Sequence, residues 1–536
     1  MLPQAPKLPF PLVAAILLLA AIPGLIEQSR DVDVLLYMAA AARANAEGSL
    51  PYAAAWIEKG PLAMGLYQAI DALFGRYCFP AIALVWVALA LSGTWLARAL
   101  AREAGADWGA GWGALGFAVG IGAVGGTLNT EVPALVLAAS ALLVWCRGLR
   151  GRARGRRAGL LSGLLIGAAF LCRQNALALV PVLVGLEMWL VARGLRERRE
   201  AVVAAGLIAA GGIAPFLATA VAYRAAGAWE PFALCFWSYN ADVYVAATRI
   251  DAPRLARIPW DLAASFLWPV RTTAALGLVG AAGVLAAARG ARAASRESAA
   301  GVAIAAAAAG SLVAMIPGLR FFTHYAAMAL PFLAALAALG LEALARRAGA
   351  RAGLVLVLTA FSLGLELAPA GWRDAGGRLI AWWERGAYRR LRDPIEWPGR
   401  DEGMVEAARL IRDRGAVEDR VFVWGMRPHV AVYADRLAAT RFVTCTFLTG
   451  LVPWERVGPA EETARWIVPG SWDLLAADLA RERPAWIVDA SHDHLFGDGA
   501  YPPERFAPLA SILARDYRRV LATGERDRLI VWQRVR

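Results

Sequence analysis

The sequence "SRDVDVLLYMAAAARANAEGSLPYAAAWIEKGP" occupies residues 29–61 and interrupts a chain that is otherwise strongly apolar. It lies between a first apolar run near residues 9–27 and a second near 79–98. Apolar runs of about 20 residues are long enough to cross a bilayer as helices. The stretch between them carries aspartates, a glutamate and a lysine, which are costly within a bilayer. It therefore predicts a polar segment at the membrane surface, between two membrane helices.

Hydrophobic residues make up 59% of the 536 residues, and long apolar runs recur along the first two thirds of the chain. Counting these runs predicts about eleven transmembrane helices. They lie near residues 9–27, 79–98, 108–127, 132–147, 158–172, 175–193, 201–222, 267–288, 299–317, 325–345 and 352–370. The fold class expected from this pattern is a polytopic α-helical membrane protein.

The formal net charge of +13 is concentrated in short loops between the apolar runs. Arginines cluster within residues 147–157, 193–199 and 289–296, at alternate helix ends. This is the positive-inside pattern, which places such loops and the N-terminus in the cytoplasm. An odd number of spans then places the chain after about residue 371 outside the cytoplasm. No nucleic-acid partner is expected, because no basic stripe lies on a soluble domain.

Two domains are expected: residues 1–370 in the membrane, with outer loops near 28–78 and 223–266, and an extracytoplasmic domain from 371 to 536. In the second domain, apolar β-type runs alternate with helical patterns, which is typical of an α/β layer domain. These runs are "RVFVWG" (Arg420–Gly425), "PAWIVDA" (Pro484–Ala490) and "RLIVWQRV" (Arg528–Val535).

The first outer segment begins with a helical pattern. Residues 32–46 hold no helix breaker, and Gly48 is a natural stop. Within this helix Asp33 and Tyr37 are four residues apart and share a face. Asp31 suits the N-cap position, where a carboxylate accepts hydrogen bonds from free amides. From spacing alone, a solvated carboxylate at the membrane surface is the favoured interpretation of Asp33.

Several motifs along the chain, in this order, resemble those of the GT-C membrane glycosyltransferases. The closest likeness is to the protein O-mannosyltransferase and lipid A aminoarabinose transferase group. The motifs are "DVLLY", "GSLPY" and "WIEKGP" in the first outer segment, "NTE" (Asn129–Glu131), "CRQNA" (Cys172–Ala176) and "GLRFFTHYAAMALPFLA" (Gly318–Ala334). One departure is visible: relatives often carry an aspartate after "PY", where this chain has Ala53, Ala54 and Ala55.

The resemblance implies an enzyme that moves a sugar from a polyprenyl-phosphate donor to an acceptor at the outer membrane surface. The acceptor class, a glycan, a lipid or a protein, stays open. Such a reaction needs a carboxylate to take the acceptor proton and cations to stabilise the departing phosphate. By its match to the motif Asp33 is expected to be the catalytic base, with Asp31 as the alternative and Tyr37 one turn on to orient it.

Lys59 is the first expected phosphate-binding cation. It directly precedes Gly60 and Pro61, where a helix is expected to begin, so its charge would lie beside a positive helix end. An interfacial lysine that reaches toward water is the alternative interpretation.

The remaining expected substrate-binding residues lie further along the chain. Arg173 falls where two short spans meet on the outer side, against the positive-inside trend, and such an arginine needs a partner or a role. Arg320 and His324 are four residues apart, and Tyr325 completes the "HY" pair of the motif. Glu131 at a helix start is expected to pair with one of these cations or contact the acceptor; an ordinary N-terminal acid explains it as well.

No metal site and no cofactor are expected. The five cysteines are scattered and form no CxxC pair. His492 and His494 flank Asp493, but no further ligand cluster accompanies them, so a surface loop is the favoured interpretation.

Two other classes of function are alternatives to the enzyme. A lipid or solute transporter or flippase would show related halves and polar residues near the bilayer midplane. The sequence has no obvious repeat, and its polar residues gather at outer helix ends. A non-catalytic membrane scaffold gives no reason for Lys59 and Arg173 at the outer surface. A multi-pass membrane glycosyltransferase is therefore the favoured prediction.

Overall fold

The structure is a computed structural model. It describes the chain except for residues 1–6, 29, 125, 150–151, 248–251, 268–279, 281, 287–294, 317–320, 350–401, 453–462, 494–495, 497–498, 525–527 and 536. The chain divides into two compact units. Unit 1 comprises residues 1–25, 83–221 and 250–381, and unit 2 comprises residues 26–82, 222–249 and 382–536.

Unit 1 is helical, and its helices follow the apolar runs of the sequence. They are α1 (Phe10–Glu27), α5 (Phe79–Glu103), α6 (Gly109–Val124), α7 (Glu131–Gly148), α8 (Arg152–Cys172), η1 (Gln174–Ala178), α9 (Leu179–Ala192), α10 (Arg198–Ala225), α12 (Ala252–Leu267), α14 (Arg296–Val313), η3 (Thr323–Met328) and α15 (Leu330–Ala348). Five segments are long and apolar enough to cross a membrane: Phe79–Glu103, Glu131–Gly148, Gly155–Cys172, Gln174–Ala192 and Arg198–Ala225.

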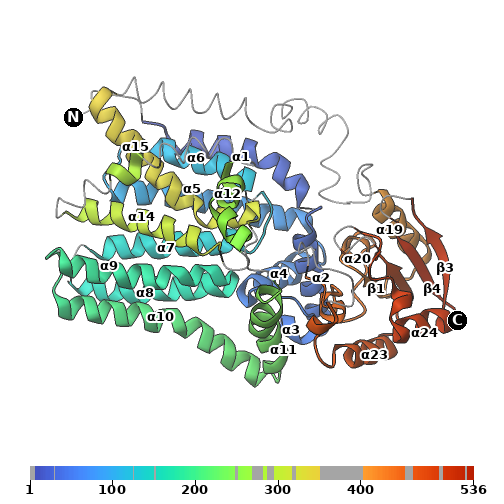
Figure 1. Cartoon of the computed structure of the whole chain (residues 1–536). Coiled ribbons are helices and arrows are strands. Elements are labelled where there is room, and N and C mark those ends of the chain that lie inside the picture. Colours follow the sequence, from blue (N-terminus) through green and yellow to red (C-terminus); the bar gives the residue numbers. More distant parts are fainter. Residues whose placement is uncertain are drawn as a thin grey trace. The chain divides into compact units, whose positions relative to one another are not determined.

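Glycines bring α8 and α10 into close contact, and Figure 1 shows the two helices running side by side. Gly159, Gly163 and Gly167 follow one another at four-residue spacing on α8. A Cβ at Gly163 would lie 2.3 Å from the carbonyl oxygen of Ile208, and one at Gly167 would lie 2.4 Å from that of Gly212. Small residues at this spacing allow helix backbones to approach in membranes, where hydrophobic burial gives little drive for association.

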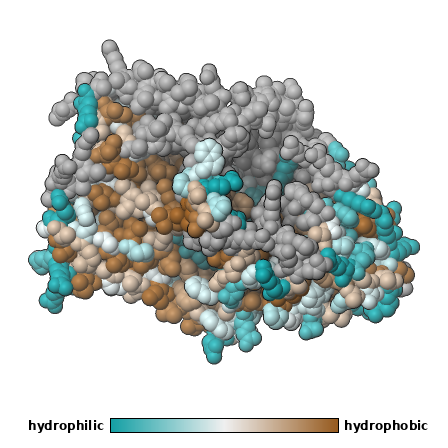
Figure 2. All heavy atoms as spheres, viewed as in Figure 1, coloured by the Kyte–Doolittle hydropathy of each residue, from teal (hydrophilic) through white to brown (hydrophobic). Residues whose placement is uncertain are grey.

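The basic helix ends of unit 1 gather at one end of its helices. The Arg147 guanidinium at the end of α7 lies 3.0 Å from the Glu103 carboxylate at the end of α5. Arg346 near the end of α15 donates a hydrogen bond to the carbonyl of Gly105. Figure 2 shows hydrophobic side chains over the helices of this unit and hydrophilic ones at its margin. This arrangement agrees with arginine clusters at alternate helix ends; on which side of the membrane they lie stays a prediction.

Unit 2 combines the outer segments with an α/β domain. Its elements are α2 (Val32–Ala46), α3 (Pro51–Ala54), α4 (Pro61–Phe74), α11 (Trp229–Ala233), the π-helix η2 (Leu234–Val245), α19 (Glu402–Arg414), β1 (Val421–Trp424), α20 (His429–Tyr433), α21 (Thr446–Thr449), η6 (Ala464–Trp466), α23 (Ser471–Glu482), β2 (Trp486–Asp489), η8 (Pro503–Arg505), α24 (Ala507–Asp516), β3 (Tyr517–Ala522) and β4 (Ile530–Arg534).

The four strands form one mixed sheet in the order β1-β2-β4-β3, and β1, β3 and β4 are marked in Figure 1. The strands β1 and β2 are parallel, with Val421 opposite Trp486, while β4 is antiparallel to both of its neighbours. All residues of β1 and β2 are buried. The three apolar β-type runs of the sequence are therefore strands, and β3 is a fourth strand that they did not predict.

Most predicted spans coincide with helices. Helices of unit 1 cover the first seven predicted spans, from 9–27 to 201–222. They also cover the predicted spans at 299–317 and 325–345. The predicted span at 352–370 and most of the one at 267–288 lie outside the described residues. The first outer segment and the α/β domain belong to the same compact unit, although more than 300 residues of sequence separate them.

Candidate functional site

The helix α2 begins as the sequence predicts, with Asp31 as its N-cap. The Asp31 carboxylate accepts hydrogen bonds from the backbone N–H of Asp33, at 2.9 Å, and of Val34, at 3.5 Å. Asp33 is the second residue of the helix and keeps its own carboxylate partly exposed. The capping role accounts for Asp31 without any catalytic task, so Asp33 is the carboxylate that capping leaves unexplained.

Lys59 lies beside Asp33. The Lys59 Nζ is 3.9 Å from Asp33 Oδ1 and 3.6 Å from Glu58 Oε1, with 14% of the lysine side chain exposed. Pro61 is the first residue of α4 and Gly60 its N-cap, as the sequence predicts. Lys59 thus directly precedes a helix N-terminus in the chain, and both the lysine charge and the positive end of the helix favour an anion nearby.

Buried tyrosines hold the segments that carry these groups. Tyr37 on α2 contacts the ring of Tyr67 on α4 edge to face, with centroids 5.2 Å apart. Burial raises the pKa of Tyr67, and the carboxylates of Asp31 and Asp33 raise it further, so the Tyr67 phenol stays protonated beside them. The Tyr52 hydroxyl donates a hydrogen bond to the carbonyl of Lys59. The structure therefore gives Tyr37 a packing role in placing α2 against α4.

The π-helix η2 reaches the same segment. Asn240 donates a hydrogen bond from Nδ2 to the carbonyl of Glu58 at 3.2 Å. Long π-helices are rare, and π-type turns occur frequently at functional sites. The second outer segment thus contacts the backbone next to Lys59, and Trp237 of the same element is 57% exposed.

A second polar group lies in unit 1, around Glu131. This carboxylate is almost fully buried at the start of α7, and its Oε1 lies 3.2 Å from Arg173 Nε and 3.8 Å from His324 Nε2. The Thr130 hydroxyl contacts the other carboxylate oxygen at 3.2 Å. The expected pairing of Glu131 with a cation is thus found with Arg173, and His324 lies near the same carboxylate oxygen.

Aromatic rings support the cations of this group. The guanidinium of Arg173 lies 4.3 Å from the ring centroid of Tyr325, in a cation–π contact. His324 stacks on Phe322 at 5.6 Å. Arg173 itself has an extended backbone between α8 and η1, so the predicted break between two spans falls at this residue. The contacts fix the guanidinium with one aromatic face and one carboxylate.

Two predicted features cannot be placed. Arg320 lies outside the described residues, and so does His494. Within the part of the chain that is described, no group of three or more histidines, cysteines, aspartates and glutamates is arranged to hold a metal ion. The absence of a metal requirement stays a prediction.

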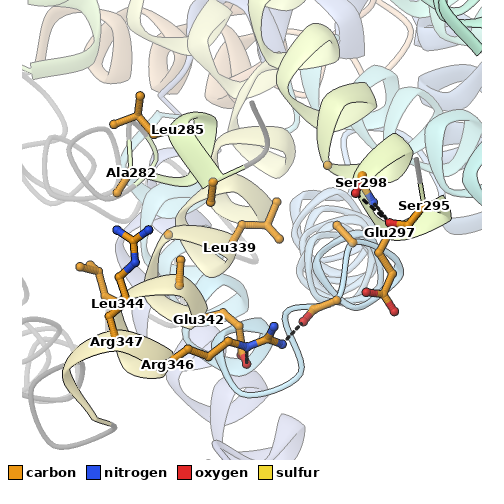
Figure 3. A pocket seen from close by; sticks show the side chains of 16 residues that line it. Ala282, Leu285, Ser295, Glu297, Ser298, Leu339, Glu342, Leu344, Arg346 and Arg347 are labelled. Atoms are coloured by element: carbon orange, nitrogen blue, oxygen red, sulfur yellow. Dashed lines mark hydrogen bonds and ion pairs between the residues drawn. The ribbon is translucent and has the colours of Figure 1, made fainter. Parts of the chain in front are cut away.

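Unit 1 also holds a cavity of about 530 Å³ near the end of α5, the start of α14 and the end of α15. Figure 3 shows Arg346 and Arg347 on one side and Glu297, Ser295 and Ser298 on the other, with apolar side chains between them. Its acids and its arginines balance, and all of its labelled charged side chains except Glu342 are exposed. The cavity therefore has no surplus of positive charge for a phosphate, and none of the predicted site residues line it.

Sequence reasoning missed Arg43, which the structure places at the centre of unit 2. Its side chain is 1% exposed and hydrogen bonds to the carbonyls of Ala54 and Ala438. The signal in the sequence is a single arginine inside the alanine-rich run "AAAARANA". A buried arginine is costly unless it is paired, which marks it for a specific role.

The fold of the whole chain is known from other proteins. No protein-family model and no curated protein sequence matches the chain. Among solved structures, ArnT from Cupriavidus metallidurans bound to undecaprenyl phosphate superposes with a TM-score of 0.59 at 15% identity, over 98% of this chain and 97% of ArnT. The chain has the fold of ArnT. The resemblance expected from the sequence motifs is thereby confirmed as a likeness of fold.

Two further structures belong to the same comparison. The apo state of the same ArnT gives a TM-score of 0.53 at 16% identity. The Archaeoglobus fulgidus oligosaccharyltransferase tethered to an acceptor peptide gives 0.49 at 13% identity, over 98% of this chain and 74% of that enzyme. At 15 to 16% identity the likeness to ArnT concerns the fold alone, and the chemistry of this chain has to be argued from its own residues.

Proposed function

We propose that this chain is a membrane glycosyltransferase that moves a sugar from a polyprenyl-phosphate donor to an acceptor at the outer surface of the membrane. The observation that carries the proposal is the 3.9 Å contact between Asp33 at the start of α2 and Lys59 at the start of α4. It is supported by the ArnT fold and by undecaprenyl phosphate as the ligand of that ArnT structure.

The chemistry assigns one task to each group. Asp33 takes the proton of the acceptor hydroxyl or amine while the acceptor oxygen or nitrogen bonds to the anomeric carbon of the sugar. The bond between that carbon and the phosphate oxygen breaks, and polyprenyl phosphate leaves with the electron pair. Lys59 and the N-terminus of α4 stabilise the negative charge of the departing phosphate.

The group around Glu131 is proposed to bind substrate. Arg173 is the only residue of that group with a permanent positive charge, and Tyr325 and Glu131 hold its guanidinium in place. A planar guanidinium suits bidentate contacts with phosphate oxygens. His324 beside the same carboxylate is assigned to substrate binding as well.

The test measures release of polyprenyl phosphate by the purified protein from a panel of polyprenyl-phosphate hexoses and pentoses. Asp33→Asn is expected to lower the rate by about 100-fold or more. Asp31→Asn is the matched control, because asparagine caps a helix as well as aspartate does, and it is expected to keep most of the activity.

Each alternative has its own outcome. Release that survives in Asp33→Asn and disappears in Asp31→Asn would assign the base to the other carboxylate. Movement of labelled lipid across proteoliposomes without any release of polyprenyl phosphate would support a transporter or flippase. Neither release nor movement, with acceptor mixtures of glycan, lipid and peptide present, would leave the scaffold as the better interpretation.

A further inference from the structure

Arg43 joins three segments of unit 2 through its buried guanidinium. Its Nε donates to the carbonyl of Ala54 at the end of α3, at 2.8 Å, and its Nη1 donates to the carbonyl of Ala438, at 2.6 Å. The third nitrogen lies 2.6 Å from the Glu47 carboxylate one turn further along α2. One side chain therefore ties α2 to the chain that leads to Lys59 and to the C-terminal α/β domain.

The partner in the C-terminal domain is a segment at the edge of the sheet. Ala438 is paired with Val421 of β1, so the carbonyl that Arg43 contacts belongs to a segment held against the sheet. Two acids and a second arginine surround the guanidinium: Arg420 lies 3.6 Å from Glu47 and 3.1 Å from Glu482. A buried guanidinium with this many partners has its desolvation cost offset only in this one arrangement.

The same edge holds the segment before Lys59. The backbone N–H of Trp56 donates to the carbonyl of Arg441 at 2.7 Å. The indole ring meets Phe442 and Phe447 edge to face, at 5.2 Å and 5.5 Å. Residues 438–447 therefore contact both parts of the outer segment: α2, which holds Asp33, and the chain that leads to Lys59.

We propose that Arg43 is a positioning residue for the transfer reaction: it sets the distance between Asp33 and Lys59 by locking α2 and the chain before Lys59 onto the C-terminal domain. The inference rests on the proposed function of these two residues. Arg43 lies ten residues beyond Asp33 on one helix, about 15 Å along its axis, so it touches neither reacting group.

A helix transmits a shift at one end to the other because it moves as a rigid rod. When Arg43 no longer holds α2 against Ala54, the Asp33 carboxylate moves relative to Lys59. A misplacement of about 1 Å by a residue far from the chemistry can cost about 100-fold in rate. Because the bond from Trp56 to Arg441 still holds the chain before Lys59, the phosphate contact is expected to remain, and the loss is expected in kcat rather than in KM.

The experiment compares Arg43→Met with Arg76→Met in the full-length protein. Arg76 ties the same outer segment to the same domain, through Asp435 at 2.8 Å, but after the end of α4, where Arg76 is half-buried and Asp435 is exposed. Arg43→Met is expected to lower kcat for polyprenyl phosphate release by about 10-fold or more with KM within twofold. Arg76→Met is expected to keep both constants.

A second variant and a second readout guard against misfolding. Arg43→Lys keeps the charge but lacks the fork needed to reach both carbonyls at once, so its kcat is expected between those of wild type and Arg43→Met. Amide hydrogen exchange within residues 52–59 is expected to quicken in both Arg43 variants and to stay at the wild-type rate in Arg76→Met.

The outcomes separate the two proposals. If the wild type is active and Arg43→Met, Arg43→Lys and Arg76→Met all keep its kcat, the positioning role is refuted and the proposed function stands. A wild type that releases no polyprenyl phosphate would refute the proposed function and, with it, the catalytic meaning of the lock. A rise in KM for the donor in Arg43→Met, with kcat unchanged, would also overturn the inference, because it would place Arg43 in donor binding.

Discussion

Arg43 and Lys59 are two cations of the same outer segment, and each has two acids near it. Arg43 is fully buried and bound at 2.6 to 2.8 Å to carbonyls and to Glu47. Lys59 is partly exposed, and its two carboxylates stand 3.6 and 3.9 Å away. The short contacts hold the Arg43 guanidinium on three sides, whereas both carboxylates near the Lys59 ammonium stand beyond hydrogen-bond distance. The difference sets a cation that is tightly bound within the fold apart from the one proposed above to stabilise a phosphate.

Lys59→Met tests the ligand side of this comparison and is expected to have the largest effect. Removing one group that stabilises charge in a transition state costs about 100- to 1,000-fold in kcat. The melting temperature is expected to stay near that of the wild type, because long, partly exposed ion pairs contribute little to stability. Steady-state release of polyprenyl phosphate and a thermal melt of the same preparation measure both.

Lys59→Arg is the control for that change. It keeps the positive charge before α4 and is expected to retain a substantial part of the activity. If Lys59→Met kept its kcat, or lost it together with the fold, the distinction between the two cations would fail.

Asp478→Asn tests the fold side, at the acid that supports the edge on which the outer segment lies. Asp478 is fully buried and accepts three hydrogen bonds from Arg441, two from its guanidinium and one from its backbone N–H. Burial alone would raise the pKa of Asp478, but the bonds and charge of Arg441 outweigh it and lower the pKa. The variant is expected to lose about 2 kcal/mol of stability at neutral pH.

The pH dependence of this loss has a definite sign. Because the folded-state pKa is lowered, Asp478 stabilises the fold fully above the pKa of an unfolded aspartate, about 4. The contribution disappears as the pH falls further, toward the folded-state pKa. The free energies of unfolding of wild type and Asp478→Asn, obtained from denaturant unfolding curves, should therefore differ at pH 7 and converge below about pH 4. A constant difference over that range would contradict the assignment.

Local features of the outer segment were predictable because they depend on neighbouring residues. Capping chemistry placed Asp31 before α2, and proline preference placed Pro61 at the first position of α4. The apolar runs predicted most helices of unit 1, because helix formation satisfies the backbone polar groups of a membrane span. The break at Arg173 followed from a charge placed between two apolar runs.

Contacts between residues far apart in the chain could not be predicted from local sequence patterns. The bond from Arg43 to Ala438 joins residues 395 positions apart, and no local pattern pairs them. The edge strand β3 was missed because its sequence "YRRVLA" is largely exposed and depends on pairing with β4. Arg173, Glu131 and His324 were each predicted as site residues, but only the fold shows that both Arg173 and His324 lie near one buried carboxylate.

Glu47→Gln and Glu58→Gln test the comparison of Arg43 with Lys59 through the smallest expected effects. Each variant neutralises one acid beside one of the two cations. Glu47 contacts Arg43 at 2.6 Å, so its neutral variant weakens a short, charge-assisted hydrogen bond and is expected to cost about 1 kcal/mol. Glu58 contacts Lys59 at 3.6 Å near the surface, and its variant is expected to change stability by less than about 0.5 kcal/mol. Denaturant unfolding of the two variants against wild type measures the difference. Equal losses would mean that both acids hold their cations in the same way, and the contrast between the short contacts of Arg43 and the longer ones of Lys59 would then carry no energetic meaning.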